Sequence, residues 1–162
     1  MISQGNKRYT HRKAELKDLK KIIELYLEDD LGQNREILEE NIDPGYLKAF
    51  EKINQDPNQY LMVVETESEG GAEIIATCQL TLMPTLVLQG SMRMNIEGVR
   101  VSEKYRGQKI GEWMMQAACE YGQSHGAVIA QLTTNKKRIR AKSFYERLGF
   151  EASHKGMKLK LD

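Results

Sequence analysis

The sequence predicts an α+β fold, in which a mixed and mostly antiparallel sheet contains one parallel crossover and carries helices on both faces. Three observations support this prediction. Apolar residues at helical spacing come first along the chain. A hairpin pattern follows, with residues 60–65 and 74–82 on either side of the turn at 69–71. A strand, an amphipathic helix and an almost wholly apolar strand then succeed one another, which is typical of a βαβ unit with parallel strands.

Composition indicates one globular domain over residues 1–162. The 162 residues are 40% hydrophobic and 29% charged, and the net charge of +1 requires neither a nucleic-acid nor a membrane partner. Two cysteines cannot form a disulfide framework and fit a reducing compartment, so we expect a cytoplasmic location. The first six residues lack an apolar signal core, and the most apolar run, 80–88, is too short to span a bilayer.

The spacing of apolar residues predicts four helical segments. The first covers residues 16–27, and the second begins near Glu36, is interrupted at Pro44-Gly45 and continues to Ile53. The third carries an apolar stripe from Ile110 to Tyr121. The last carries Ala141, Phe144, Tyr145 and Leu148, and Gly149 is its natural end. After it, residues 150–154 and 157–161 are expected to form a closing hairpin around Lys155-Gly156.

The strand after the hairpin changes its pattern partway along. Apolar residues occupy even positions from Met92 to Ile96 and odd positions from Val99 to Val101. Because strand side chains alternate with a period of two, this change indicates one inserted residue, and a β-bulge near Glu97-Gly98 would supply it. A strand that ends at Gly98 explains the pattern equally well. A bulge would redirect side chains and leave backbone groups unpaired.

Residues 106–111, Arg-Gly-Gln-Lys-Ile-Gly, lie between this strand and the start of a helix. The first turn of a helix has unpaired N–H groups and a positive dipole end, and Arg106 and Lys109 add charge, so the turn could hold a pyrophosphate. It is not a Walker loop, because Glu112 stands five residues after Gly107 and no Gly-Lys-Ser/Thr follows. It is not G-x-G-x-x-G either. Taken alone, residues 106–111 are also compatible with an ordinary turn between a strand and a helix.

Taken in order, these segments resemble the GNAT superfamily of acyl-CoA-dependent N-acyltransferases. The resemblance rests on residues 99–101, residues 106–111, Asn135, and the run from Phe144-Tyr145 to Gly149-Phe150. It implies a sheet that is splayed between the bulged strand and the parallel strand after it, with the pantetheine arm of acetyl-CoA in the gap. It further implies a cofactor-binding set of Val99, Arg100, Val101, Arg106, Gly107, Gln108, Lys109, Ile110, Gly111 and Asn135.

The resemblance also assigns Tyr145 as a general acid near the thiol sulfur. The family usually has glycine where Lys109 stands. A lysine can still offer its backbone N–H if its φ is negative, so we expect cofactor binding to survive this difference. Acetylation of an amine requires loss of a proton from a group whose pKa is roughly 10.4. Glu97, at the expected bulge, is the candidate base. The alternatives are a solvent-facing Glu97 and a Tyr145 that belongs to the core.

Other nucleophiles and metals are not expected. Cys119 falls inside a helix, and Cys78 lies in a strand without a readable partner, so neither suits covalent catalysis. The three histidines have no metal-ligand spacing with one another or with the cysteines. The expected co-substrate is acetyl-CoA, without a metal.

Charge is unevenly distributed along the chain. Residues 24–40 hold seven acids and one base, and residues 135–160 hold nine bases and two acids. Solvated helix faces explain most of these charges. The functional interpretation is that the basic end meets the phosphates of CoA, while the acidic segment favours a cationic acceptor amine on a small molecule or peptide. The sequence is also compatible with a homodimer. The competing functions are a non-catalytic CoA-binding sensor or degenerate acetyltransferase, and nucleic-acid binding through residues 136–142.

Overall fold

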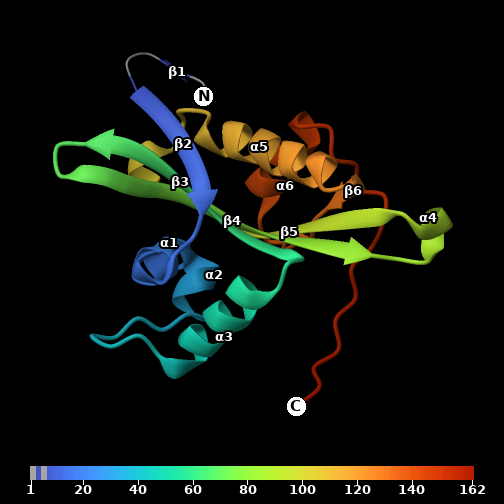
Figure 1. The fold of residues 1–162 in the computed structure, drawn as a ribbon, viewed down its shortest axis with the longest axis horizontal. Helices are drawn as coiled ribbons and strands as arrows, with labels where there is room; N and C mark the ends of the chain where they lie inside the picture. The colour runs from blue at the N-terminus through green and yellow to red at the C-terminus, as the bar shows by residue number, and fades with distance from the viewer. Residues whose placement is uncertain (1–2, 5–6) are drawn as a thin grey trace.

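The computed structural model describes residues 3–4 and 7–162. Its sheet has six strands in sequence order: β1 (Ser3–Gln4), β2 (Lys7–Lys13), β3 (Gln59–Ser68), β4 (Gly71–Pro84), β5 (Met92–Val101) and β6 (Ala127–Gln131). All neighbouring strands are antiparallel except β5 and β6, which are parallel and joined through helix α5 (Ile110–Ser124). Figure 1 shows this curved sheet between two layers of helices. The predicted α+β fold with one parallel crossover is confirmed.

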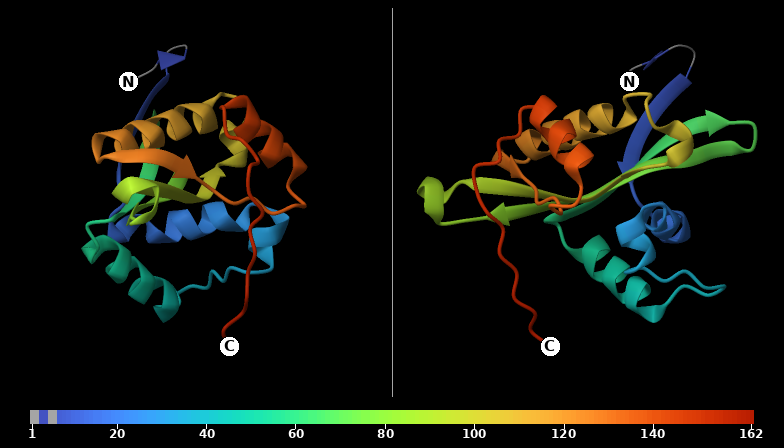
Figure 2. Two further views of the ribbon diagram at one scale, coloured as in Figure 1. Left: turned by 90° about the vertical axis from the view of Figure 1, so that its right-hand side faces the viewer. Right: turned by 180° about the vertical axis from the view of Figure 1, so that it is seen from behind.

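Helices cover both faces of the sheet, as predicted. One layer holds α1 (Leu19–Leu27), which follows a 3-10 turn at Leu16–Asp18, with α2 (Asp30–Gln33) and α3 (Pro44–Gln55). The other layer holds α5 and α6 (Ile139–Arg147), as both views in Figure 2 show. The short α4 (Val87–Gly90) lies at the tip of the β4–β5 hairpin, and a 3-10 turn (Glu103–Tyr105) follows β5.

The period of two in the strands divides the core into two parts. Leu61 and Val63 of β3 pack with Ile22 and Ile23 of α1, whereas Met62 and Val64 face the α5 side. All these side chains are buried. Each such burial contributes about 1.5–3 kcal/mol, so the helical stripes read from the sequence are what hold each layer to the sheet.

The helix predicted from Glu36 to Ile53 differs from the structure in its first part. Residues 36–43 are not helical, and α3 begins only at Pro44. Asp43 is the N-cap, and its carboxylate accepts the Gly45 N–H at 2.7 Å. Proline is favourable in the first turn, where its missing N–H would have no partner, so Pro44 starts the helix instead of interrupting it. The short α2 was not predicted.

The predicted C-terminal hairpin is wrong. Residues 150–162 contain no strand, and the C-terminal end of the chain extends away from the body of the domain (Figure 1). The alternation of Met157, Leu159 and Leu161 with lysines predicts a strand, but alternation does not specify the edge with which a strand pairs.

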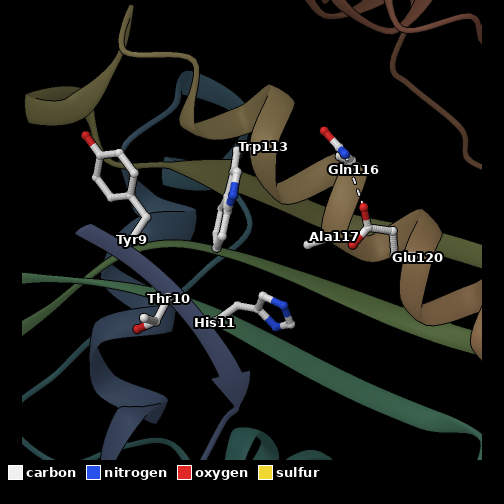
Figure 3. A pocket seen from close by; sticks show the side chains of 7 residues that line it. All are labelled: Tyr9, Thr10, His11, Trp113, Gln116, Ala117 and Glu120. Carbon is white, nitrogen blue, oxygen red and sulfur yellow. Dashed lines mark hydrogen bonds between the residues drawn. The ribbon is translucent and has the colours of Figure 1, made fainter. Parts of the chain in front are cut away.

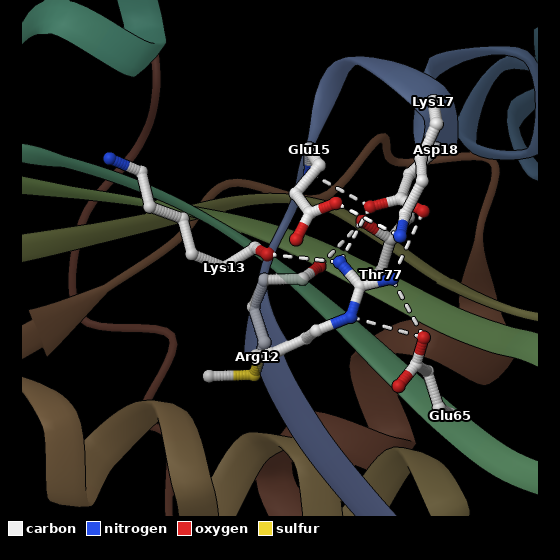
Figure 4. A network of polar contacts seen from close by, with 8 residues as sticks. Arg12, Lys13, Glu15, Lys17, Asp18, Glu65 and Thr77 are labelled. Atoms are coloured by element: carbon white, nitrogen blue, oxygen red, sulfur yellow. Dashed lines mark hydrogen bonds and ion pairs between the residues drawn. The ribbon is translucent and has the colours of Figure 1, made fainter. Parts of the chain in front are cut away.

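Arg12 joins β2, β3 and the start of α1 through a polar network (Figure 4). Its Nη1 and Nη2 donate to the two Asp18 carboxylate oxygens at 2.6 and 3.0 Å, and Nη2 also donates to Glu65 at 2.7 Å. The Asp18 carboxylate also accepts the Glu15 N–H at 2.8 Å. Burial opposes ionisation of Asp18, but Arg12 and this amide hold its pKa below the usual value. The network thereby fixes α1 against the sheet.

Within the part of the chain that the structure describes, no helix is long and apolar enough to cross a membrane.

Candidate active site

The expected β-bulge is present in β5. Thr77 of β4 lies opposite Arg100, and Gln79 lies opposite Glu97, so Cys78 alone faces both Gly98 and Val99. Gly98 has φ of +61°, a conformation that favours glycine. A Cβ at this position would lie 3.2 Å from the Tyr26 hydroxyl oxygen of α1. The parity change in the sequence therefore located the bulge to within one residue, and glycine is required both by φ and by the neighbouring helix.

Beyond the bulge, one edge of β5 has no strand partner among the described residues. The pairs between β5 and β6 end at Asn95 and Gln131, yet β5 continues to Val101. The backbone N–H and C=O groups that point to this side from Ile96 onward are outside the parallel ladder. An extended chain that carries amides could pair with them as an added strand does. The parallel pairing of β5 with β6 thus ends before Val99, Arg100 and Val101.

The turn from Arg106 to Gly111 leads from this strand into α5. Lys109 is the N-cap residue and supplies no side-chain cap, so the first amides of the helix remain available for an anion. A Cβ on Gly107 would meet nothing within 4 Å, which leaves the turn accessible. A Cβ on Gly111 would lie 3.3 Å from Phe144 and 3.6 Å from Val101. The end of β5, the helix start and α6 therefore meet closely.

The conformation of Lys109 differs from the expectation. Its φ is +59°, in the left-handed region, and not negative. The loop keeps the backbone shape that a glycine would give it, and Lys109 adopts that shape at a cost of about 1–2 kcal/mol. Sequence reasoning missed this because the turn sets the local φ, whatever residue occupies it.

Lys109→Gly should be more stable than Lys109→Ala. Both variants remove the charge, but only glycine relieves the left-handed strain, and it loses part of that gain through its freer unfolded state. We expect a difference of about 1 kcal/mol, or roughly 2–4 °C in Tm, by thermal unfolding. An alanine variant that melts above the glycine variant would contradict the assignment of strain to this residue.

The two candidate catalytic side chains lie on different elements. Glu97 is exposed on β5, beside the bulge. Tyr145 lies on α6 and is partly buried, with Phe144 and Phe150 against its ring at centroid distances of 5.2 and 5.9 Å. Burial raises the pKa of Tyr145, so its hydroxyl stays protonated at neutral pH.

Asn135 has a local structural role. Its side-chain oxygen accepts the Lys137 N–H at 2.9 Å, and its carbonyl oxygen accepts the Arg138 N–H at 2.8 Å. These contacts shape the turn before α6. The side chain is exposed, and its amide nitrogen remains available for a ligand.

An ion cluster that the sequence did not reveal lies behind the bulge. The Asp29 carboxylate is 2.7 Å from Arg138 Nη2 and 3.3 Å from Arg100 Nε. The Arg100 guanidinium also lies 5.8 Å from the centre of the Tyr26 ring. Although burial opposes ionisation of Asp29, the Gly32 amide and both arginines hold its pKa below the usual value. Burial lowers the pKa of Arg100 and raises that of Tyr26 to about 12.

A polar surface continues from Glu97 along the same face of the sheet. Met94 and Ile96 are buried in the core on the α5 side, so Arg93, Asn95 and Glu97 face the other way. Arg93 Nη1 donates to Gln131 of β6 at 3.4 Å, and its buried Nε has no hydrogen-bond partner. The polar residues at odd positions before the bulge were the sequence signal for this surface.

A separate pocket of about 370 Å³ lies between β2 and α5 (Figure 3). Tyr9, His11 and Trp113 form its aromatic side, and Gln116 and Glu120 form its polar side. None of the residues predicted for the site lines it. Its link to the site is the Tyr9 hydroxyl, which donates to the Gln108 side chain in the turn at 3.2 Å.

Both thiols are poor nucleophiles. Cys78 is fully buried, and burial raises its pKa to about 12. Burial also raises the pKa of Cys119. Because the thiolate is the reactive form, neither cysteine suits a covalent intermediate. Among the described residues, no group of three or more His, Cys, Asp or Glu side chains could hold a metal ion.

A bulged strand with a free edge thus leads through a turn to a helix N-terminus without a side-chain cap, an arrangement that suits an extended ligand carrying phosphate. Comparison with known proteins identifies the family. Residues 19–150 match the model of the acetyltransferase (GNAT) family, and the chain belongs to that family.

Two curated relatives match parts of this chain, and a solved structure matches nearly all of it. A glucosamine 6-phosphate N-acetyltransferase from Trypanosoma brucei brucei is 32% identical over 54% of this chain and 58% of its own length. An aminoalkylphosphonate N-acetyltransferase from Salmonella typhimurium is 41% identical over 36% of this chain and 38% of its own length. The alignment therefore spans less than two thirds of either relative. A structure described as a transcriptional regulator from Bacillus halodurans has a TM-score of 0.88 and 39% identity, covering 95% of this chain and 100% of that one.

Proposed function

We propose that this chain is an N-acetyltransferase that moves an acetyl group from acetyl-CoA directly to a primary amine. The observation that carries the proposal is the unpaired edge of β5 from Ile96 to Val101, which is continuous with the open N-terminus of α5. The edge suits the amides of the pantetheine arm, and the helix start suits the diphosphate. Acetyl-CoA, when bound, supplies the acetyl thioester.

The residues around the bulge supply the remaining chemistry. Glu97 takes a proton from the acceptor ammonium, directly or through a water, so that the neutral amine can form the new N–C bond. Backbone N–H groups at the bulge polarise the acetyl carbonyl. As the C–S bond breaks, Tyr145 donates a hydrogen bond to the departing sulfur. Thiol pKa values are about 8.5, so the help needed from a tyrosine of raised pKa is modest.

The acceptor that we propose is a small molecule that carries an anionic group beside its amine. The acidic segment led to the expectation of a cationic acceptor, but Asp29 is paired with two arginines, Glu28 accepts the Glu103 N–H, and Glu36 accepts the Tyr46 hydroxyl. Around Asp29 the two arginines leave net positive charge. Both curated relatives are named for amines that bear a phosphate or a phosphonate. A cationic acceptor is the second candidate, favoured by the exposed Glu39 and Glu40.

Release of free thiol from acetyl-CoA, with mass spectrometry of the products, tests this function. The panel contains glucosamine 6-phosphate, an aminoalkylphosphonate, spermidine and a peptide with a free N-terminus. We expect turnover with a phosphate- or phosphonate-bearing amine and a KM that rises with salt. Preference for spermidine would overturn the proposed acceptor. Added mass on the protein alone would indicate autoacetylation instead.

Arg138→Gln should raise the acceptor KM by about 10-fold or more with a smaller effect on kcat, since a hydrogen bond to a charged group contributes about 1.5–3 kcal/mol. Arg140→Gln is the matched control, because Arg140 is exposed on the same helix. Steady-state kinetics at fixed acetyl-CoA measure both. Equal KM values in the two variants would remove Arg138 from the acceptor site.

A CoA-binding sensor without catalysis is the alternative from another class. The Bacillus halodurans neighbour, which is described as a transcriptional regulator, favours it. Binding of CoA without acetyl transfer to any amine of the panel would support the sensor and contradict the enzyme. We also propose that the chain acts as a homodimer.

A further inference from the structure

The pocket between β2 and α5 lies outside the candidate active site, and the proposed reaction does not use it (Figure 3). Its volume of about 370 Å³ is within the range of small-molecule sites, at the lower end. One wall is β2, where alternation places Tyr9 and His11 on the same face of the sheet. The other wall is one face of α5, where Trp113, Ala117 and Glu120 recur at helical spacing.

Aromatic rings form the walls of this pocket without filling it. The centre of the Trp113 ring lies 5.7 Å from that of His11 and 6.4 Å from that of Tyr9, and the rings are tilted by 60° and 50°. Tilted rings at these distances leave part of each face uncovered, which stacked rings would not. The neighbouring Ala117 on α5 is small, so the helix leaves this space open. The pocket therefore offers aromatic faces to a ligand.

The charge of the lining favours a cation. Glu120 is exposed at the polar side of the pocket, and its carboxylate accepts a hydrogen bond from the Gln116 side-chain amide at 3.1 Å. Among the described residues that line the pocket, none is a lysine or an arginine, so apart from His11 its formal charge is that of Glu120 alone. Aromatic faces and a carboxylate both attract a cation and repel a phosphate. A compact organic cation, such as an alkylammonium group, fits this combination.

Two hydrogen bonds join the pocket to the turn at residues 106–111. The Tyr9 hydroxyl donates to the side-chain oxygen of Gln108 at 3.2 Å. The backbone N–H of Trp113 donates to the carbonyl oxygen of Lys109 at 3.0 Å. Residues that line the pocket thus also hold the turn, so a ligand packed against the Tyr9 and Trp113 rings restricts the motion of the turn.

We propose that this pocket is a regulatory site that binds a compact organic cation, and that its occupation strengthens the binding of CoA at the turn. The cation lies against the Trp113 and His11 rings and pairs with Glu120. Because it holds Tyr9 and the bond from Tyr9 to Gln108, the turn is ordered before CoA arrives and loses less conformational entropy when CoA binds. By linkage, CoA strengthens the binding of the cation by the same factor. The coupling rests on the proposed function, whereas the cation site does not.

Choline tests the cation site, with the alcohol in which carbon replaces the choline nitrogen as a neutral ligand of the same shape. Choline has no N–H, so it cannot be an acceptor amine. Because Trp113 is the only tryptophan of the chain, its fluorescence reports on the pocket. At constant ionic strength, millimolar choline should give a saturable change in emission, and the alcohol should give none. Equal responses to the two ligands, or no saturable response to choline, would overturn the cation site.

Variants of the pocket sharpen this test. Glu120→Gln should weaken choline binding about threefold or more, because it removes the charge and keeps the size. Glu51→Gln is the matched control and should bind choline as the unmodified chain does: Glu51 also accepts from a glutamine four residues later, Gln55, but lies on α3 in the other helical layer. Ala117→Leu should fill the pocket and abolish the response, with thermal unfolding to show that the variant is folded. Unchanged choline binding in Glu120→Gln or Ala117→Leu would contradict the assignment.

Calorimetry with CoA, in the presence and absence of saturating choline, tests the coupling. Choline should lower the Kd of CoA by about fivefold or more. Tyr9→Phe keeps the ring and removes the hydroxyl, so it should still bind choline, while its Kd for CoA should no longer respond. An unchanged Kd in the unmodified chain, or competition between the two ligands, would overturn the regulatory role. Binding of choline without any binding of CoA would overturn the proposed function and the regulatory role, but not the cation site.

Discussion

Glu97→Gln is expected to lower kcat by about 10²–10⁴ at neutral pH, because the acceptor remains protonated without a base beside the bulge. The loss should shrink toward pH 10, where roughly half of a lysine-like amine is already neutral. Tyr145→Phe should cost less, near 10²-fold or below, since thiolate departure needs little help. Thiol release with the best acceptor, followed across pH, measures these effects.

Glu67→Gln is the matched control, because Glu67 is also an exposed strand glutamate but lies at the far end of β3. It should behave as the unmodified chain does. If the two catalytic-site variants also retain full activity at every pH, Glu97 and Tyr145 are not the acid and base. If the loss of kcat in Glu97→Gln does not change with pH, Glu97 positions the substrate and does not act as the base.

Asp18→Ala is expected to have the largest effect on stability, about 1.5–3 kcal/mol, because it removes the bidentate partner of Arg12 and leaves only Glu65 to pair with it. For a chain of this length, Tm should fall by roughly 3–12 °C. Lys21→Gln is the control, since Lys21 lies in a loose surface pair with Glu24 at 3.8 Å. That change should stay within about 0.5 kcal/mol in thermal or urea unfolding.

The Asp18 carboxylate should also make the stability of the fold depend on pH. The folded-state pKa of Asp18 is below its ordinary value of 3.8, so its contribution is present above that pH and is lost as pH falls through the lower folded-state value. The free energy of unfolding should therefore decline below about pH 4. Asp18→Asn should show a smaller decline. Equal slopes in the two proteins would show that Asp18 is not responsible.

Much of the site could be predicted because it follows from local backbone rules. The parity change from Met92 to Val101 located the bulge, since an inserted residue is what reverses alternation within a strand. The open helix start at Ile110 followed from the turn before it. The left-handed Lys109 was missed, because propensity favours another conformation and the loop overrides it.

Features that depend on distant contacts could not be predicted. The pairing of Asp29 with Arg100 and Arg138 joins three separate elements, and no local pattern indicates which charges will meet. The strand pattern of residues 157–161 was recognised, but the predicted hairpin partner, residues 150–154, forms no strand with it. Alternation defines the two faces of a strand and leaves its neighbour undefined.

Backbone amide shifts on titration with CoA test the central claim most directly, with pantetheine as the matched ligand that lacks the diphosphate. CoA should shift the amides of both segments, residues 96–101 at the free edge of β5 and residues 107–112 at the start of α5. Pantetheine should shift only the first segment. Millimolar CoA that leaves both segments unchanged would contradict the site, and equal shifts at α5 with pantetheine would contradict the assignment of the diphosphate to the helix N-terminus.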